Sequence, residues 1–357
     1  MPKFVNEVLG MVSPKDLLNT GFMISRPQDP LEGLFDDQQT NNLVATYHTL
    51  AAQYQIPQMA QFHAFDVEAQ KSIPAPIEEH NVEKGLIKVK RSTSELLRQL
   101  LGRGVTVEEE LYRHVMDFAA DLADQVVTRA KIARAEVMAT GKMTIKENDL
   151  DITIDYNVPA GNLTKTLDLG AGAAKSVTDQ LQDLVDEAAN VGVTLTGIVT
   201  SRAVLTKLRR NTEIQKAING VNMEGILVSN AALRAWLADE YGITQIITDD
   251  LSYSTPYTMD SLGRPEAHAH RYYPTDTITF FGTANGMKLG SSLWGVPPEN
   301  EIGRFYEVGS STVNPYVYLT QWAESDPAVL WTKASALYVP VLYNPNSLYV
   351  ASVIETA

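Results

Sequence analysis

The sequence predicts an α+β protein organised around one long amphipathic helix. Apolar residues recur every three or four positions from Glu108 to Gly141, which is the pattern of a single helix. Residues 176–248 alternate helical and strand patterns, and the chain beyond residue 275 alternates apolar and polar positions as strands do. We therefore expect an α/β segment inserted between a helix and the strands that pack on it.

Composition narrows the class of protein. A chain of 357 residues with 44% hydrophobic content can bury a large core and form two or three domain-like units. No apolar run approaches the roughly 18 residues of a membrane span, and Glu7 and Asp16 interrupt the segment where a signal peptide would be apolar. We expect a cytoplasmic protein that has no contact with a membrane.

Cysteine content and charge exclude further classes. The chain has no cysteine, which excludes disulfides, thiolate metal sites and cysteine nucleophiles. Its 43 acidic and 29 basic residues give a formal charge of −14, which disfavours binding of a phosphate backbone by a general basic surface.

The first 93 residues predict an arm followed by a hairpin. Residues 1–60 have short apolar clusters and no compact pattern, whereas FHAFDVEAQ and GLIKVKRST within 62–93 read as two extended segments around Pro74 and Pro76. Arms of about twelve residues would extend roughly 40 Å, beyond a radius of gyration near 20 Å for a compact chain of this length. An isolated ribbon is marginal in water, so the hairpin either reaches a neighbouring subunit or folds back on its own domain.

The long helix has one apolar stripe and two marked ends. Glutamates 108–110 lie at the positive end of the helix dipole, Lys131, Arg134 and Lys142 lie toward the negative end, and Gly141 suits the left-handed position after the helix. We expect the stripe to pack on the strands after residue 275. Its members are Leu111, Val115, Phe118, Leu122, Val126, Ala130, Ala133 and Val137.

The elements after the helix follow from local signals. MTIKEND and LDITIDYNV predict a short hairpin turning at Asn148 and Asp149. Helices are expected near 177–190, 202–218 and 230–240, capped by Ser176, Ser201 and Ser229 or Asn230, with the strands LTGIVT and ITQIIT between or after them. TITFFGTANGMKLG predicts a hairpin at Asn285 and Gly286, and ASALYVPVLYNPNSLYVASV a strand pair turning at 344–346.

The segment LDLGAGAAKS superficially resembles a phosphate-binding loop. A Walker A loop needs glycine immediately before the lysine and again five residues earlier, and here Ala174 and Leu169 stand at those positions. The dinucleotide pattern also fails, because Lys175 follows where the third glycine belongs. We expect a linker and a capping box made by Ser176 and Asp179.

A metal site is the second candidate. Glu266, His268 and His270 would share one face of a strand and could ligate a divalent ion. Their surroundings, however, read as a loop, so a solvated surface turn is favoured. The same interpretation covers the carboxylate pairs Asp249 with Asp250, Asp149 with Asp151, and Glu299 with Glu301. No residue is assigned a catalytic, cofactor-binding or metal-binding role.

Three segments carry a resemblance to a known family. ARAEVMATGKMTIKEND at 133–149, with Glu136, Gly141, Lys142 and Thr144, is similar to the helix exit of the lambda-like tailed-bacteriophage major capsid proteins, the major capsid protein E family. YYPTDTITFFGTANGMKLG at 272–290 and WTKASALYVPVLYNPNSLYVASV at 331–353 resemble later strands of that family. The order of predicted elements extends the resemblance over most of the chain.

The resemblance implies the Hong Kong 97-type phage capsid fold. Its parts would be an N-terminal arm at 1–60, an extended loop at 61–93, a peripheral domain at 94–165 and 275–357 with the spine helix 108–141, and an axial domain at 166–274. The implied function is self-assembly, as hexamers and pentamers, into the icosahedral head shell that encloses double-stranded DNA. Implied partners are a scaffolding protein, a portal protein and a decoration protein. Neither catalysis nor a cofactor is implied.

Charge in the hairpin predicts where subunits meet. Glu78, Glu79 and Glu83 lie toward its tip and Lys88, Lys90 and Arg91 on its return arm, so opposite charges could pair between neighbours. Some relatives crosslink a loop lysine, for which Lys71 or Lys84 would serve, but lambda-like members usually rely on decoration proteins, so no crosslink is expected.

Two other classes of protein remain open. One is a nucleotide-binding or metal-dependent enzyme built on residues 166–274. The other is a non-shell virion component, such as a tail or decoration protein, which would have the same composition and lack the long helix.

Overall fold

The structure is a computed structural model of the chain, and part of the chain is described in it. The described residues are 29–50, 56, 59–60, 62, 71, 77–93, 107–147, 149–220, 225–255, 258–259, 265–266, 268–283, 288–300, 309–313, 316–325 and 328–356. Within that part, no helix is long and apolar enough to cross a membrane.

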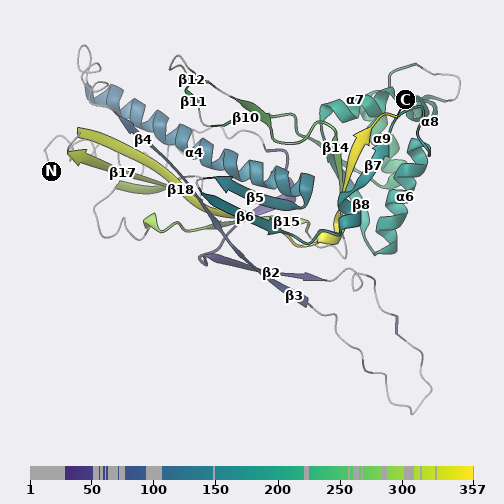
Figure 1. Ribbon diagram of the computed structural model, residues 1–357, viewed down its shortest axis with the longest axis horizontal. Coiled ribbons are helices and arrows are strands. Elements are labelled where there is room, and N and C mark those ends of the chain that lie inside the picture. Colours follow the sequence, from purple (N-terminus) through teal and green to yellow (C-terminus); the bar gives the residue numbers. More distant parts are fainter. Residues whose placement is uncertain are drawn as a thin grey trace.

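The long helix α4 spans Val107–Thr140, one residue from the predicted bounds at either end. From Leu122 to Val137 the predicted stripe is almost completely buried, whereas the side chains of Leu111 and Val115 lie outside the described part. The helix packs mainly on β18 and also on β14, β17 and β19, which confirms the expected contact with strands after residue 275. Figure 1 shows α4 lying along the larger sheet. The helix contacts β4 and β5 as well.

The larger sheet has six strands in the order β1, β15, β18, β17, β16, with β4 also paired to β18. Their bounds are β1 Phe35–Gln39, β4 Gly85–Thr93, β15 Gly290–Gly295, β16 Gly309–Val313, β17 Val317–Ser325 and β18 Ala328–Leu342. β1 joins β15 in parallel, whereas the other pairings are antiparallel. The sheet therefore brings the first described strand beside one that lies about 250 residues later in the chain.

The smaller sheet has five strands in the order β7, β19, β14, β8, β9 and carries a layer of four helices. The strands are β7 Lys165–Asp168, β8 Thr194–Thr200, β9 Gln245–Thr248, β14 Thr277–Thr283 and β19 Leu348–Ile354. The helices are α6 Val177–Asn190, α7 Arg202–Arg210, α8 Thr212–Asn219 and α9 Asn230–Tyr241. Ser176, Ser201 and Ser229 cap α6, α7 and α9 as predicted.

The predicted helix at 202–218 is two helices. α7 ends at Arg210, and the side chain of Asn211 accepts hydrogen bonds from the backbone N–H groups of Glu213 and Ile214, which starts α8. An asparagine that caps a helix competes with continuation of the preceding one. The break therefore has a local cause that the apolar periodicity did not reveal.

The smaller sheet separates two hydrophobic cores. Ile198 and Phe280 face the core shared with the four helices, whereas their neighbours Val199 and Phe281 face the core that contains α4. Successive side chains of a strand point to opposite faces, so β8 and β14 each contribute to both cores. The end of α4 is also held to this sheet by a hydrogen bond from Thr279 Oγ1 to the Met138 carbonyl, at 2.9 Å.

The chain makes a tight turn where α4 ends and β5 begins. Gly141 has a φ of +69°, which confirms the predicted left-handed conformation, and a Cβ there would lie 2.9 Å from Val158 Cγ2. Glu136 Oε1 accepts a hydrogen bond from the Thr144 N–H at 3.0 Å, so the family-like residues fix the exit of the chain. The hairpin of β5 Lys142–Glu147 and β6 Leu150–Asp155 follows as predicted.

The two hairpins predicted after residue 275 are wrong. β14 pairs with β8 and β19, while β15 pairs with β1 and β18 in the other sheet. β18 and β19 likewise belong to different sheets, joined by the 3₁₀ turn η3 at Pro345–Ser347. Turn residues indicate a change of direction and not which strands pair, and tertiary packing decided the pairing here.

The predicted hairpin at 62–93 also has the wrong partners. GLIKVKRST forms β4, but β4 pairs with β18 in the larger sheet. The hairpin in the structure joins β2 Val44–Leu50 to β3 Ile77–Glu83, and FHAFDVEAQ lies outside the described residues apart from Phe62. The remaining short elements are η1 Glu32–Leu34, α5 Ala160–Leu163, β10 Ser252–Ser254, β11 Thr258–Met259, β12 Pro265–Glu266 and β13 Ala269–Arg271.

Candidate functional site

The glycine turn before α6 is built for contact with the chain's own C-terminal segment. A Cβ at Gly170 would lie 1.9 Å from the Thr356 carbonyl oxygen, so the two backbones approach too closely for another residue. Lys175 pairs with Asp183 of α6. The Val177 N–H, in the first turn of that helix, donates to a Glu213 carboxylate oxygen at 2.6 Å. A carboxylate therefore already occupies the helix end at which a phosphate would bind.

Ser176 behaves as the predicted cap. Its Oγ accepts a hydrogen bond from the Asp179 N–H at 3.0 Å. The geometry of this turn thus favours a structural role for LDLGAGAAKS over nucleotide binding.

The candidate metal ligands lie on an exposed surface. Glu266 belongs to β12 and His270 to β13, in two different strand pairs. A Glu266 oxygen lies 4.0 Å from His268 Nε2, and the ring of His270 lies 5.6 Å from that of Tyr253. Among the described residues, no three His, Asp or Glu side chains are grouped as metal ligands.

Two of the carboxylates expected to be solvated are buried instead. Asp249 is completely buried at the end of β9, where burial raises its pKa although nearby Lys131 acts in the opposite direction. Glu299 is also buried. Burial opposes its charge, but its ion pair with Lys333, at 2.5 Å, holds its pKa below the ordinary value. Asp149 and Asp151 are exposed as expected, and Glu301 lies outside the described residues.

A buried charged cluster holds the first described segment against α4. Arg134 is 3% exposed; it pairs with Asp29, lies 3.6 Å from Asp37 and donates to Ser292 Oγ at 3.1 Å. One turn earlier, Lys131 Nζ lies 4.2 Å from the ring centre of Tyr272. Sequence reasoning placed both cations at the helix terminus, but their position beside the stripe residues Ala130 and Ala133 was a signal of burial.

The structure separates the acidic and basic residues predicted to join subunits. Glu78, Glu79 and Glu83 are exposed on β3. Lys88, Lys90 and Arg91 lie on β4 in the larger sheet. Arg91 pairs with Asp121 of α4 at 2.6 Å, and Lys90 Nζ lies 4.3 Å from the ring centre of Trp331.

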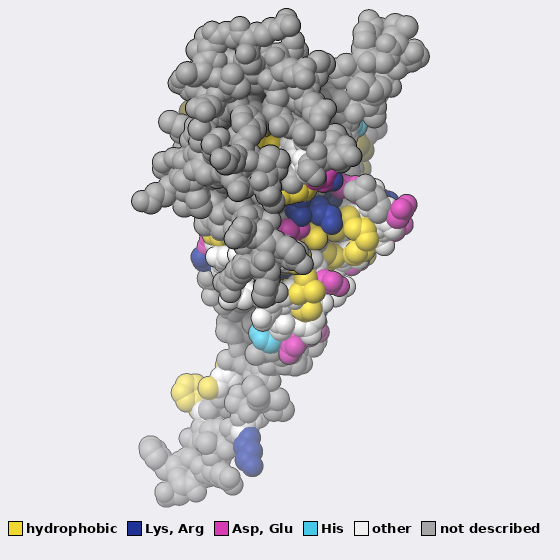
Figure 2. All heavy atoms as spheres, turned by 90° about the vertical axis from the view of Figure 1, so that its left-hand side faces the viewer, with side chains coloured by type: hydrophobic (Ala, Val, Ile, Leu, Met, Phe, Trp, Pro, Cys, Tyr) yellow, Lys and Arg dark blue, Asp and Glu magenta, His cyan; other side chains and the backbone are white. Residues whose placement is uncertain are grey.

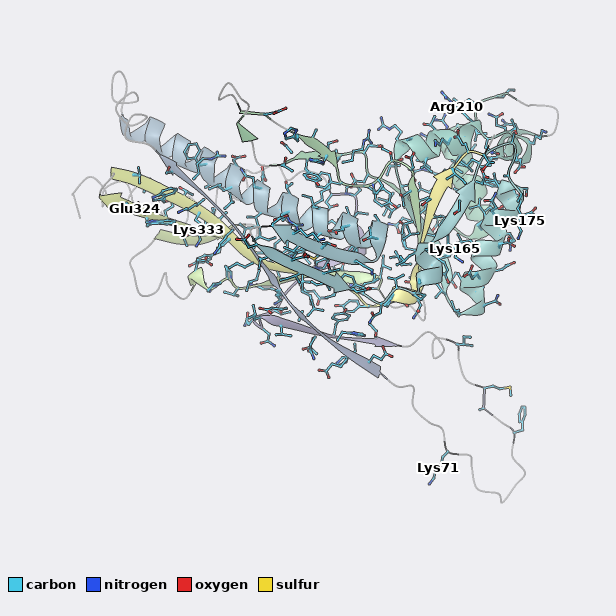
Figure 3. All side chains as sticks on the ribbon, viewed as in Figure 1. Lys71, Lys165, Lys175, Arg210, Glu324 and Lys333 are labelled. Atoms are coloured by element: carbon cyan, nitrogen blue, oxygen red, sulfur yellow. The ribbon has the colours of Figure 1, made fainter. Side chains whose placement is uncertain are left out.

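The two lysines considered for crosslinking differ in the exposure of their side chains. Lys84 is 3% exposed, and its Nζ donates to the carbonyl oxygens of Thr40 at 3.0 Å and Asn42 at 2.6 Å. Burial lowers its pKa. Lys71 is exposed, and Figure 3 shows it far from both sheets, beyond the end of β2 and β3.

A large open groove, which sequence reasoning missed, lies at the base of the β2–β3 hairpin. It has a volume of about 1420 Å³ and is lined by that base, β4, the β5–β6 hairpin and α4. We call it the basal groove. Leu150, Ile152 and Ile154 alternate along β6 and line it, and the first two are exposed. Their spacing in LDITID was the available signal, since apolar residues at period two mark one face of a strand.

One comparison with known proteins identifies a family. The model of the family described as phage major capsid protein E matches residues 41–353. A search of curated proteins finds no match.

Two solved structures resemble the fold. A crystal structure of a prophage protein from Escherichia coli CFT073, described as a putative capsid protein, has a TM-score of 0.56 at 12% identity and covers 96% of this chain and 99% of that one. A phage-related protein from Bordetella bronchiseptica RB50 has a TM-score of 0.54 at 9% identity and covers 96% and 97%. At these identities the likeness concerns the fold alone.

Proposed function

The chain belongs to the phage major capsid protein E family, and from that premise we propose how its parts build the shell of a phage head. Family membership makes it a structural protein of the virion and not an enzyme, located in the capsid shell and assembling with copies of itself. Its mixed α+β fold resembles that of the prophage protein from Escherichia coli.

We propose domains in the expected order, with limits that follow the strand pairings. The N-terminal arm comprises about residues 1–43 and the extended loop 44–83, because β2 and β3 form their own sheet. The peripheral domain comprises α4, the β5–β6 hairpin and the larger sheet. The axial domain comprises the smaller sheet with α6 to α9, and it includes β14 and β19, which the expected boundary near residue 275 had excluded.

The β2–β3 hairpin is the observation that carries this proposal. Among the described strands, β2 and β3 pair only with each other, and a two-stranded sheet is marginally stable in water. Ala45 and Tyr47 anchor its base in the core that contains α4. Contacts from another copy would complete it. The side chains of Glu78, Glu79 and Glu83 project from β3 into solvent, so we propose that these three glutamates meet lysines of a neighbour.

Lys88 and Lys90 of β4 are the exposed basic partners that we propose for those glutamates. Arg91 was expected to act with them, but its ion pair with Asp121 gives it a partner within the subunit. Charge pairing between copies would set the register of neighbouring subunits. Many weak contacts repeated around a shell give it stability without one strong interface.

The other proposed partners follow from the family. We propose that hexamers and pentamers form around a scaffolding protein, that the shell incorporates a portal protein, and that a decoration protein stabilises it. The formal charge of −14 is consistent with DNA being enclosed without sequence-specific binding. Burial of Lys84 supports a shell without crosslinks at that residue.

Electron microscopy of the overexpressed protein tests the proposal directly. Closed shells, sheets or tubes are expected in negative stain, with closed shells favoured by coexpressed scaffolding protein. Sedimentation of the same samples gives the assembled fraction. A protein that remains strictly monomeric under all assembly conditions, with and without its scaffold, would contradict the proposed assembly.

A further inference from the structure

A buried carboxylate lies near the point where the first described segment meets α4. Asp249, at the end of β9, is completely buried. Its Oδ1 accepts a hydrogen bond from the Leu251 N–H at 3.1 Å, whereas its Oδ2, also buried, has no hydrogen-bond partner among the described residues. A buried carboxylate oxygen without a donor is costly when the group is ionised, because water no longer solvates its charge. Protonation of Asp249 would remove that cost.

The charges around Asp249 do not balance. Three carboxylates, those of Asp29, Asp37 and Asp249, face two cations of α4, Lys131 and Arg134. Arg134 contacts Asp29 and Asp37, and Lys131 is the cation that acts on Asp249. One carboxylate is therefore in excess. Acidic side chains at the surface, such as those in Figure 2, face water that screens their charge, and this cluster lacks that screening.

The surroundings of Asp249 favour its neutral form. Burial raises the pKa of Asp249, and the charge of Lys131 and the Leu251 N–H act in the opposite direction. The charges of Asp29 and Asp250 raise that pKa further. The charged and titratable groups that face the cluster are Lys131 and Arg134 of α4, Asp29 of the first segment, Asp37 of β1, Asp250 after β9, and Tyr272 after β13.

Asp249 is coupled to the first described segment through Lys131 and Asp29. The ionised form of Asp249 repels Asp29, and both carboxylates then share the positive charge of Lys131. Once Asp249 is neutral, the repulsion ends and the charge of Lys131 is left to Asp29. The ion pair of Asp29 with Arg134 holds the segment that leads into β1. Proton binding at Asp249 should therefore strengthen the attachment of that segment.

We propose that Asp249 binds a proton between about pH 5 and 8, and that the bound proton holds the first described segment more firmly on α4. The attachment is strongest in acid and weakens as the pH rises through this range, because the folded form then loses the proton. The switch lies within one chain. Its use in a shell rests on the proposed function, since the segment is part of the proposed N-terminal arm.

Hydrogen exchange across β1 tests the proposal. The full-length protein is kept in the same state of assembly, and the protection of Phe35–Gln39 is measured from pH 5 to pH 8, with each rate divided by the intrinsic rate at that pH. Coupling between two sites typically changes an equilibrium about 5- to 150-fold. Protection should therefore be at least about fivefold greater at pH 5 than at pH 8.

Two substitutions separate Asp249 from other carboxylates. Asp249→Asn copies the neutral carboxyl group, so the protection of β1 should stay high at both pH values. The matched control is Asp124→Asn, because Asp124 of α4 also has a raised pKa, of about 6. This control should retain the pH dependence of β1, since Asp124 is outside the cluster.

Lys131→Met gives an independent test that does not need a folded Asp249→Asn variant. Loss of the cation that favours ionised Asp249 should move the midpoint of the protection step to higher pH, in measurements extended to about pH 9. Circular dichroism of each variant checks that it is folded.

Three results would overturn the inference. They are a parent protein without a protection step between pH 5 and 8, a step that persists in folded Asp249→Asn, and a midpoint that stays in place or moves to lower pH in Lys131→Met. None of them bears on whether copies assemble into shells, so failure of this inference and failure of the proposed function are distinguishable.

Discussion

Replacement of Arg134 by methionine should release the first described segment from α4. Arg134 and Asp29 form an ion pair in which both side chains are at most 5% exposed. Arg134 also lies within ion-pair distance of Asp37 and donates a hydrogen bond to Ser292. Loss of one partner of a buried pair costs about 3 to 5 kcal/mol, because the other charge is left buried without compensation. Methionine preserves much of the apolar volume, so the effect reports the charge.

Hydrogen exchange of β1 measures this change. A loss of about 3 kcal/mol corresponds to a factor of about 160 in an opening equilibrium. The amides of Phe35–Gln39, which pair with β15, should therefore exchange at least about a hundredfold faster in Arg134→Met. Lys288→Met is the control, since Lys288 pairs with Asp36 of the same strand at the surface. Exposed pairs contribute little, so less than about fivefold is expected there.

The cluster can also be tested by removing both charges. β1 of the double variant Asp29→Asn with Arg134→Met should exchange more slowly than β1 of Arg134→Met alone, because the buried carboxylate of Asp29 is no longer left unpaired. If β1 exchanges within tenfold of the parent protein in Arg134→Met, the cluster does not hold the segment.

Three further predictions concern other parts of the chain. Burial and the neighbouring Asp121 raise the pKa of Asp124 to about 6. A carboxyl group with a raised pKa contributes stability that is present below about pH 4 and lost as the pH rises through 6. In urea denaturation, Asp124→Asn should therefore stabilise the protein by about 1 kcal/mol at pH 8 and have no such effect at pH 4. Gly141→Ala should destabilise the protein by about 2 kcal/mol because of its positive φ and the contact with Val158, whereas Gly161→Ala, with open space around it, should be near neutral in the same assay. Glu79→Lys should reduce the sedimenting assembled fraction, and Lys88→Glu in the same chain should restore part of it; no restoration would contradict charge pairing between copies.

Local signals predicted the helices well because their causes are local. The stripe, the terminal glycine and the caps at Ser176, Ser201 and Ser229 gave α4, α6, α7 and α9 near their observed starts. Each depends on residues within a few positions of one another, so sequence order alone carries the information.

Strand pairing was predicted poorly because it depends on distant partners. Asn285 and Gly286 favour a reversal, yet β14 and β15 found their neighbours in different sheets. The same limit hid the partners of Arg134, since Asp29 lies 105 residues away in the chain. The basal groove was missed because segments far apart in the sequence form it, although the alternation in β6 did mark one of its walls.

The path of the chain ties the two sheets to each other and leaves the β2–β3 hairpin outside both. In the described part, the chain passes between the sheets after β6, after β14 and after β18, so three connections join them. Strands of the smaller sheet contribute side chains to both cores, and Thr279 bonds to the end of α4. Separation of the two sheets would expose the core that contains α4, which opposes large independent movement. Among the described strands, β2 and β3 pair only with each other, and Ala45 and Tyr47 of β2 pack into the core that contains α4. Beyond Tyr47, no described residue of the hairpin belongs to either core, which is consistent with our proposal that this end of the hairpin contacts another copy.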